Sequence, residues 1–118
     1  MTFMQKILGA TAAMALSAGA ALAEPALIFD LGGKFDKSFN EAAFNGAQRW
    51  AEETGNSFRE IELQSEAQRE QALRRFAEAG ANPIVMAGFA FADALGQVAA
   101  DYPDTKFTII DMVVDAPN

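Results

Sequence analysis

The sequence of 118 residues contains no cysteine and no histidine. The chain therefore forms no disulfide, and it lacks both the thiol nucleophile and the commonest general base of enzymes. Basic side chains are also scarce, because nine Lys and Arg stand against sixteen Asp and Glu, which gives a formal net charge of −7. Such an acidic chain, without a basic stripe, is repelled by phosphate backbones, and we expect no nucleic acid partner.

Residues 1–23 have the composition of a secretory signal peptide. Lys6 is the only charged side chain there, an apolar run follows over 7–22, and residues 21–23 (Ala-Leu-Ala) provide small residues for cleavage. The alternative, a transmembrane helix, needs about 20 strongly apolar residues. Alanine is the commonest residue of the run here, which is interrupted by two glycines and a serine. We therefore expect a mature chain that begins at Glu24 and is not stably inserted in a membrane.

Short apolar runs alternate with helical patterns over the rest of the chain. The expected strands are residues 26–29, 57–63, 84–87 and 107–110, and the expected helices lie between them. The run 57–63 alternates with charged residues, which predicts an edge strand, whereas 84–87 is uninterrupted, as in a central parallel strand. The strand-helix alternation predicts an α/β fold: a parallel sheet with helices on both faces.

The expected helices carry start signals and amphipathic faces. Ser38 with Glu41, and Ser65 with Gln68, both match the capping box. Charged side chains of the second helix, Arg69 among them, indicate a solvated face without a further role. The third helix is expected over about 90–100. Apolar residues of the first helix share one face that we expect to be inward: Phe39, Ala43, Gly46, Ala47 and Trp50.

Polar and aromatic residues gather where the expected strands end. The carboxyl ends of parallel strands meet at one edge of a sheet, which is where open α/β sheets bind ligands. Phe39 can stack on a planar heterocycle, Asn40 offers a donor and an acceptor, and the carboxylates of Asp30 and Asp111 accept hydrogen bonds. Each also has a structural alternative: Phe39 in the core, Asn40 and Asp36 in turns or caps, and Asp111 as a cap after its strand.

Two sequence blocks resemble the basic membrane protein family, the substrate-binding proteins of ABC importers that include the purine nucleoside receptors. Residues 30–40, with the sequence DLGGKFDKSFN, resemble the opening motif of that family. The resemblance covers residues 26–118. It implies that 24–118 form the N-terminal lobe of a two-lobed protein of the type I periplasmic-binding-protein architecture, incomplete because the second lobe is absent. The second block agrees in order and spacing: Gly88-Phe89, Ala92-Asp93-Ala94, Val98-Ala99, Tyr102-Pro103-Asp104, Phe107 and Ile110-Asp111.

The resemblance also implies a function. The ligand would be a nucleoside, probably a purine nucleoside by family, or a similar small polar heterocycle; the partner would be an ABC permease, and no catalysis, cofactor or metal is expected. Alternatives are a sugar-binding protein of the same architecture and a secreted α/β enzyme that works with Asp and Ser alone. The ligand-binding residues would be Asp30, Phe39, Asn40 and Asp111, with Gly88, Phe89, Asp36 and Ser38 beside them.

The resemblance leads to a prediction about location as well. Many family members carry a lipidated cysteine at the cleavage site, and this sequence has no cysteine. We therefore expect a periplasmic protein, secreted through a cleaved signal peptide and not lipid-anchored.

Overall fold

The computed structural model describes residues 23–118. The expected signal peptide lies outside the described residues, except for Ala23, and stays a prediction. The strands are β1 (Ala26–Phe29), β2 (Arg59–Glu62), β3 (Ile84–Ala87) and β4 (Phe107–Ile110). The helices are α1 (Phe39–Thr54), α2 (Gln68–Glu78) and α3 (Ala92–Val98), with 3-10 turns η1 (Phe89–Phe91) and η2 (Ala99–Asp101).

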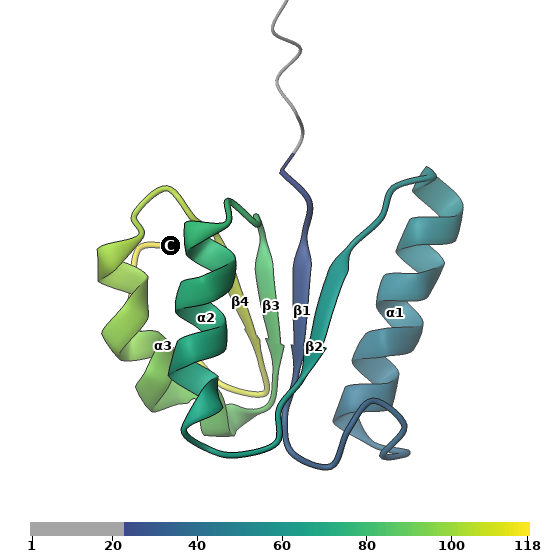
Figure 1. The fold of residues 1–118 in the computed structure, drawn as a ribbon, viewed down its shortest axis with the longest axis horizontal. Coiled ribbons are helices and arrows are strands. Elements are labelled where there is room, and N and C mark those ends of the chain that lie inside the picture. The colour runs from purple at the N-terminus through teal and green to yellow at the C-terminus, as the bar shows by residue number, and fades with distance from the viewer. Residues whose placement is uncertain (1–22) are drawn as a thin grey trace, which may run out of the picture.

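The four strands form one parallel sheet in the order β2-β1-β3-β4. Helix α1 covers one face of this sheet, and α2 and α3 lie side by side on the other (Figure 1). The predicted parallel α/β sheet with helices on both faces is confirmed. The predicted edge position of the second strand is confirmed too, because among the described strands β2 pairs with β1 alone, and its charged side chains are exposed.

The main core lies between the sheet and the pair α2 and α3. Alternate residues of β1 and β3 point to this side, and Ile28 is aligned with Met86 across the two strands. Each large apolar side chain that becomes fully buried stabilises the fold by about 1.5–3 kcal/mol. The core side chains that are essentially inaccessible on this side are Ile28, Leu73, Ile84, Met86, Phe91 and Val98.

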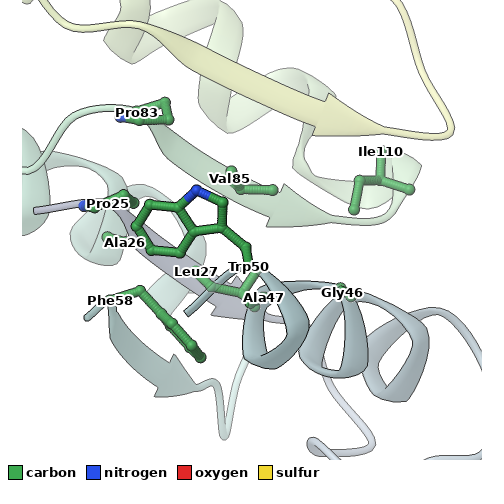
Figure 2. A pocket seen from close by; sticks show the side chains of 11 residues that line it. Pro25, Ala26, Leu27, Gly46, Ala47, Trp50, Phe58, Pro83, Val85 and Ile110 are labelled. Atoms are coloured by element: carbon green, nitrogen blue, oxygen red, sulfur yellow. The ribbon is translucent and has the colours of Figure 1, made fainter. Parts of the chain in front are cut away.

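The face beneath α1 is packed less completely. Among the residues of α1, only the first-turn Asn40 is buried. The predicted inward face is therefore only partly correct: Ala43, Ala47 and Trp50 are half-buried, whereas Gly46 and Phe39 are exposed. A hollow of about 340 Å³ remains between α1 and the sheet, and the Trp50 indole lies over it from the helix (Figure 2). In the part of the chain that the structure describes, a single helix covers a four-stranded face, which is why the apolar stripe of α1 is incompletely buried.

The predicted capping box at the start of α1 is wrong. Ser38 is the N-cap residue, but its side chain makes no capping hydrogen bond. The Asp36 carboxylate accepts hydrogen bonds from the backbone N–H groups of Ser38 (2.8 Å), Glu41 (3.1 Å) and Asn40 (3.3 Å) instead. The Glu41 carboxylate accepts a hydrogen bond from the N–H of Lys37 at 2.9 Å. Lys37 lies in the turn before the helix and has a positive φ of 56°. An acceptor two residues ahead of Ser38 thus satisfies the helix N–H groups that the serine was expected to satisfy.

The second capping box is wrong for a similar reason. Helix α2 begins at Gln68 rather than directly after Ser65, and its N-cap residue Ala67 has no side-chain acceptor. The Gln68 side chain accepts from the N–H of Gln64 at 2.7 Å, one residue before the serine. The third predicted helix is shorter than expected, since α3 is flanked by the 3-10 turns η1 and η2, a common form of helix ends.

Candidate functional site

A small cavity of about 180 Å³ lies at the carboxyl ends of β1, β3 and β4. This is the edge of the sheet where the sequence predicted a site, and the cavity brings together all the predicted residues except Ser38. Three residues that were not predicted, Leu31, Ala87 and Ala90, complete the lining. The full lining is Asp30, Leu31, Asp36, Phe39, Asn40, Ala87, Gly88, Phe89, Ala90 and Asp111.

Two exposed aromatic side chains stand at this cavity. Phe39, the first residue of α1, is 53% exposed, and Phe89, the first residue of η1, is 66% exposed. The alternative that Phe39 packs in the core does not fit this exposure. Phe89 follows Gly88, whose φ of 114° and ψ of 150° are accessible almost only to glycine. The turn at Gly88 therefore places an aromatic ring at the rim of the sheet.

The side chain of Asn40 holds the loop that follows β1 in place. Asn40 is almost fully buried, and its Oδ1 accepts from the N–H of Asp30 at 3.1 Å. Its Nδ2 donates to the carbonyl oxygens of Asp30 at 3.0 Å and of Gly33 at 3.2 Å. Both amide protons are thus used within the protein, so the expected donor for a ligand is not available. Asn40 instead joins the end of β1 to the loop that follows it.

The carboxylate of Asp36 lines the cavity while capping α1. Desolvation raises the pKa of Asp36, but the hydrogen bonds from the backbone N–H groups of Glu41, Ser38 and Asn40 outweigh it, so the pKa lies below its ordinary value. The capping alternative for Asp36 is therefore what the structure shows. Its negative charge also lies at the N-terminal end of α1, where the helix dipole favours an anion.

Asp30 is paired with a residue that the sequence interpretation missed. Arg69, in the first turn of α2, donates from Nε to Asp30 Oδ1 at 2.9 Å and from Nη2 to Oδ2 at 3.3 Å. Arg69 was expected on a solvated face, yet only 15% of its side chain is exposed. The prediction for Arg69 is wrong because helical periodicity cannot show that the end of β1 lies over the start of α2.

Asp111 differs from the other carboxylates of the cavity. It is exposed, follows β4 directly and has a positive φ of 70°, a conformation that aspartate tolerates better than most residues. It takes part in none of the ion pairs formed within residues 23–118. Its carboxylate oxygens can therefore accept hydrogen bonds from a group that enters the cavity.

The loop between β1 and α1 is tied to the edge strand on its other side. The N–H of Lys34 donates to Glu62 Oε1 at 2.8 Å, and its ammonium group pairs with Glu60. The same ammonium lies 4.6 Å from the centroid of the Phe44 ring, which also meets Phe35 edge to face at 5.6 Å between centroids. These contacts hold the loop on β2 and keep the Lys34 charge away from the cavity lining.

The hollow beneath α1 is larger than this cavity but has different chemistry. Its lining consists of apolar side chains such as Trp50, Phe58 and Val85, and residues 23–118 contribute no carboxylate, amide or hydroxyl side chain to it (Figure 2). Ligand sites combine apolar walls with a few polar groups that fix orientation. The cavity at the strand ends satisfies that description, and the larger hollow does not.

Within residues 23–118, no three acidic side chains come close enough together to hold a metal ion. The same residues include no helix that is long and apolar enough to cross a membrane.

The chain is similar to proteins of known families over most of its described length. A model of the PnrA-like ABC transporter substrate-binding proteins matches residues 24–118. An uncharacterized lipoprotein of Pyrococcus furiosus is 40% identical over 90 residues, which are 73% of this chain and 22% of that protein. A Lactococcus lactis protein named ABC transporter nucleoside-binding protein BmpA is 27% identical over 93 residues, which are 75% of this chain and 26% of that protein.

A solved structure agrees with these relatives. The crystal structure of an ABC transporter solute-binding protein from Aeropyrum pernix superposes with a TM-score of 0.74 and 35% identity, over 80% of this chain and 26% of that chain. The chain therefore spans only about a quarter of the length of the proteins that it matches.

The relatives overturn one prediction. Proteins of Pyrococcus furiosus, Pyrococcus abyssi and Pyrococcus horikoshii that match this chain are all named lipoproteins. The prediction of a periplasmic protein that is not lipid-anchored is contradicted by these names. It was wrong because it used a single feature, the missing cysteine, to exclude a lipid anchor.

The sequence and the fold of the chain indicate the same family. The family model covers the described chain from Glu24 to Asn118, and the solved solute-binding protein shares its fold at 35% identity. The chain belongs to the family of PnrA-like ABC transporter substrate-binding proteins.

Proposed function

We propose that this chain forms one wall of the ligand site of an ABC transporter substrate-binding protein, and that the ligand is a nucleoside, with a purine base preferred. The observation that carries the proposal is the cavity at the strand ends, where exposed Phe39 and Phe89 stand beside the carboxylates of Asp30 and Asp111. The Lactococcus lactis relative, whose name states nucleoside binding, supports the same ligand class.

The chemistry of the cavity suits a planar polar heterocycle. An exposed phenylalanine ring stacks on a base, and stacking of this kind is worth about 1–3 kcal/mol per base. The carboxylate of Asp111, which forms no ion pair within residues 23–118, can accept from ring N–H, amino or sugar hydroxyl groups. Asn40 has a positioning role in this proposal, because its amide protons hold the strand end and the loop in place.

The cavity covers only one side of such a ligand. Its volume of about 180 Å³ lies below the roughly 300–1,000 Å³ of ligand pockets. In our proposal residues 24–118 act as the N-terminal lobe, and a second lobe supplies the opposite wall. The relatives that match this chain are about four times as long, which is enough for such a lobe. The closed protein would then deliver its ligand to an ABC permease.

The site is proposed to bind its ligand without transforming it. The sequence has no histidine or cysteine to act as a base or nucleophile. Hydrogen bonds from the helix N-terminus hold the pKa of Asp36 below its ordinary value, which makes that carboxyl group a poor general acid near neutral pH. Turnover of a bound nucleoside would contradict this part of the proposal.

Replacement of Phe39 tests the proposed stacking. Phe39→Ala in the chain from Glu24 should weaken guanosine binding by about 1–3 kcal/mol, because the stacking surface is lost. NMR titration measures this change in affinity. Phe35→Ala is the matched control, since Phe35 is also exposed but packs on Phe44 and does not line the cavity.

The outcome separates the alternatives. Equal affinities for the two variants would show that Phe39 does not stack on the ligand. Ribose or another sugar that bound as tightly as guanosine would favour the sugar-binding protein over the nucleoside-binding protein.

A further inference from the structure

Arg69 holds the Asp30 carboxylate with two hydrogen bonds from one planar group. Nε and Nη2 donate to separate carboxylate oxygens at 2.9 and 3.3 Å, and only 15% of the Arg69 side chain and 18% of the Asp30 side chain are exposed. This pair joins the end of β1 to α2. Helix α2 lies on one face of the sheet (Figure 1). Bidentate pairs of this kind fix orientation as well as charge.

The guanidinium group is also fixed by an aromatic ring. Its Cζ lies 5.8 Å from the centroid of Phe91, a fully buried residue of η1. Arginine stacks on aromatic rings and forms a planar fork, whereas lysine does neither in the same way. Arg69 is thus held from two sides, and it holds Asp30 in turn.

The Arg69–Asp30 pair affects the net charge of the cavity, and the net charge affects which ligands bind. Three carboxylates line the cavity: Asp30, Asp36 and Asp111. Within residues 23–118, Arg69 is the only basic residue that forms an ion pair with any of them. Asp36 is compensated by the backbone N–H groups at the start of α1. Without Arg69, the cavity would attract cations through two uncompensated carboxylates.

We propose that Arg69 is a positioning and specificity-determining residue, which orients the Asp30 carboxylate and balances its charge so that the cavity selects neutral ligands over cationic ones. The inference rests on the proposed function, because it concerns ligands of the same cavity. Two of the roughly four lone-pair sites of a carboxylate are taken by Arg69, so Asp30 can still accept from a neutral donor.

A pair of nucleosides that differ in charge tests the proposal. Adenosine is neutral, and 1-methyladenosine carries a positive charge at neutral pH. NMR titration of the chain from Glu24 gives the ratio of their dissociation constants for each variant. Arg69→Gln should shift this ratio toward the cation by at least about tenfold, because Asp30 then stands without its partner. Arg74→Gln is the matched control, since Arg74 also lies on α2 but pairs with Glu70 and Asp101, outside the cavity.

Two further variants separate charge balance from a merely structural role. Arg69→Lys keeps the charge but not the planar fork, so the ratio should stay near that of the unaltered chain while both affinities fall. Adding Asp30→Asn to Arg69→Gln removes both charges and should return the ratio toward its original value. Loss of folding would lower both affinities together, and would not reverse the ratio in the double variant.

The possible results bear on different claims. If the unaltered chain binds adenosine, but Arg69→Gln and Arg74→Gln give the same ratio, the role of Arg69 is refuted and the proposed function stands. If the ratio shifts but the double variant does not restore it, charge balance is refuted. If the unaltered chain binds neither nucleoside at millimolar concentration, the proposed function fails, and this inference fails with it.

Discussion

The role of Asn40 can be tested by removing its amide. In Asn40→Ala, the N–H of Asp30 and the carbonyl oxygens of Asp30 and Gly33 lose the partners that they have in a buried position. Each hydrogen bond contributes about 0.5–1.5 kcal/mol net. Alanine regains about 0.6 kcal/mol through its higher helix propensity. The free energy of unfolding should therefore fall by about 2–3 kcal/mol, which is a large part of the roughly 5–15 kcal/mol that stabilises a domain.

Urea unfolding followed by the fluorescence of Trp50, the single tryptophan, measures this loss. At an m-value of about 1–3 kcal/mol/M, the midpoint should fall by about 0.7–3 M. Asn45→Ala is the matched control, because Asn45 is an exposed residue of the same helix. If both variants had the same midpoint and Asn40→Ala alone lost nucleoside binding, Asn40 would be a ligand contact, and its positioning role would be refuted.

Three further predictions concern the helix start, the α1 stripe and the affinity. Asp36→Asn should flatten the fall of the unfolding free energy at acid pH. The pKa of Asp36 is lower in the folded than in the unfolded chain, so its stabilisation is present above the unfolded-state pKa near 3.8 and is lost as pH falls through the folded-state pKa. An unchanged acid limb would contradict the capping role. Gly46→Ala should stabilise α1 by about 0.5–1 kcal/mol in thermal melts, because an added Cβ meets no atom within 4 Å; a lower Tm would reveal an unseen contact. Isothermal titration of the chain from Glu24 should give a millimolar Kd for guanosine, about −4 kcal/mol, and a micromolar value would show that one lobe suffices.

The sheet could be predicted from the sequence because its signals are local. The apolar runs that form β1, β3 and β4 stand out from their neighbours, and the charges of Arg59, Glu60 and Glu62 mark β2 as an edge. The strand-end positions of Asp30 and Asp111 follow from the same pattern. A parallel sheet brings the carboxyl ends of its strands to one edge, wherever the helices between them begin and end.

The predictions that failed depend on contacts between distant residues or on competition between neighbours. Arg69 looks like any charged residue of an amphipathic helix, and its pairing with Asp30 joins positions 39 residues apart. Ser38 fits the capping pattern, but Asp36 reaches the same N–H groups through the turn at Lys37. The amide of Asn40 looks free in sequence and is used by backbone groups up to ten residues away. Spacing alone does not show which of several acceptors or donors is used.

The central claim, that a nucleoside binds at the strand ends, is tested most directly by mapping backbone amide shifts of the chain from Glu24 during a guanosine titration. We predict concentration-dependent shifts at Phe39, Gly88, Phe89 and Asp111, with little change around the hollow beneath α1. Shifts centred on Trp50 in that hollow, or no shifts at millimolar guanosine, would contradict the account.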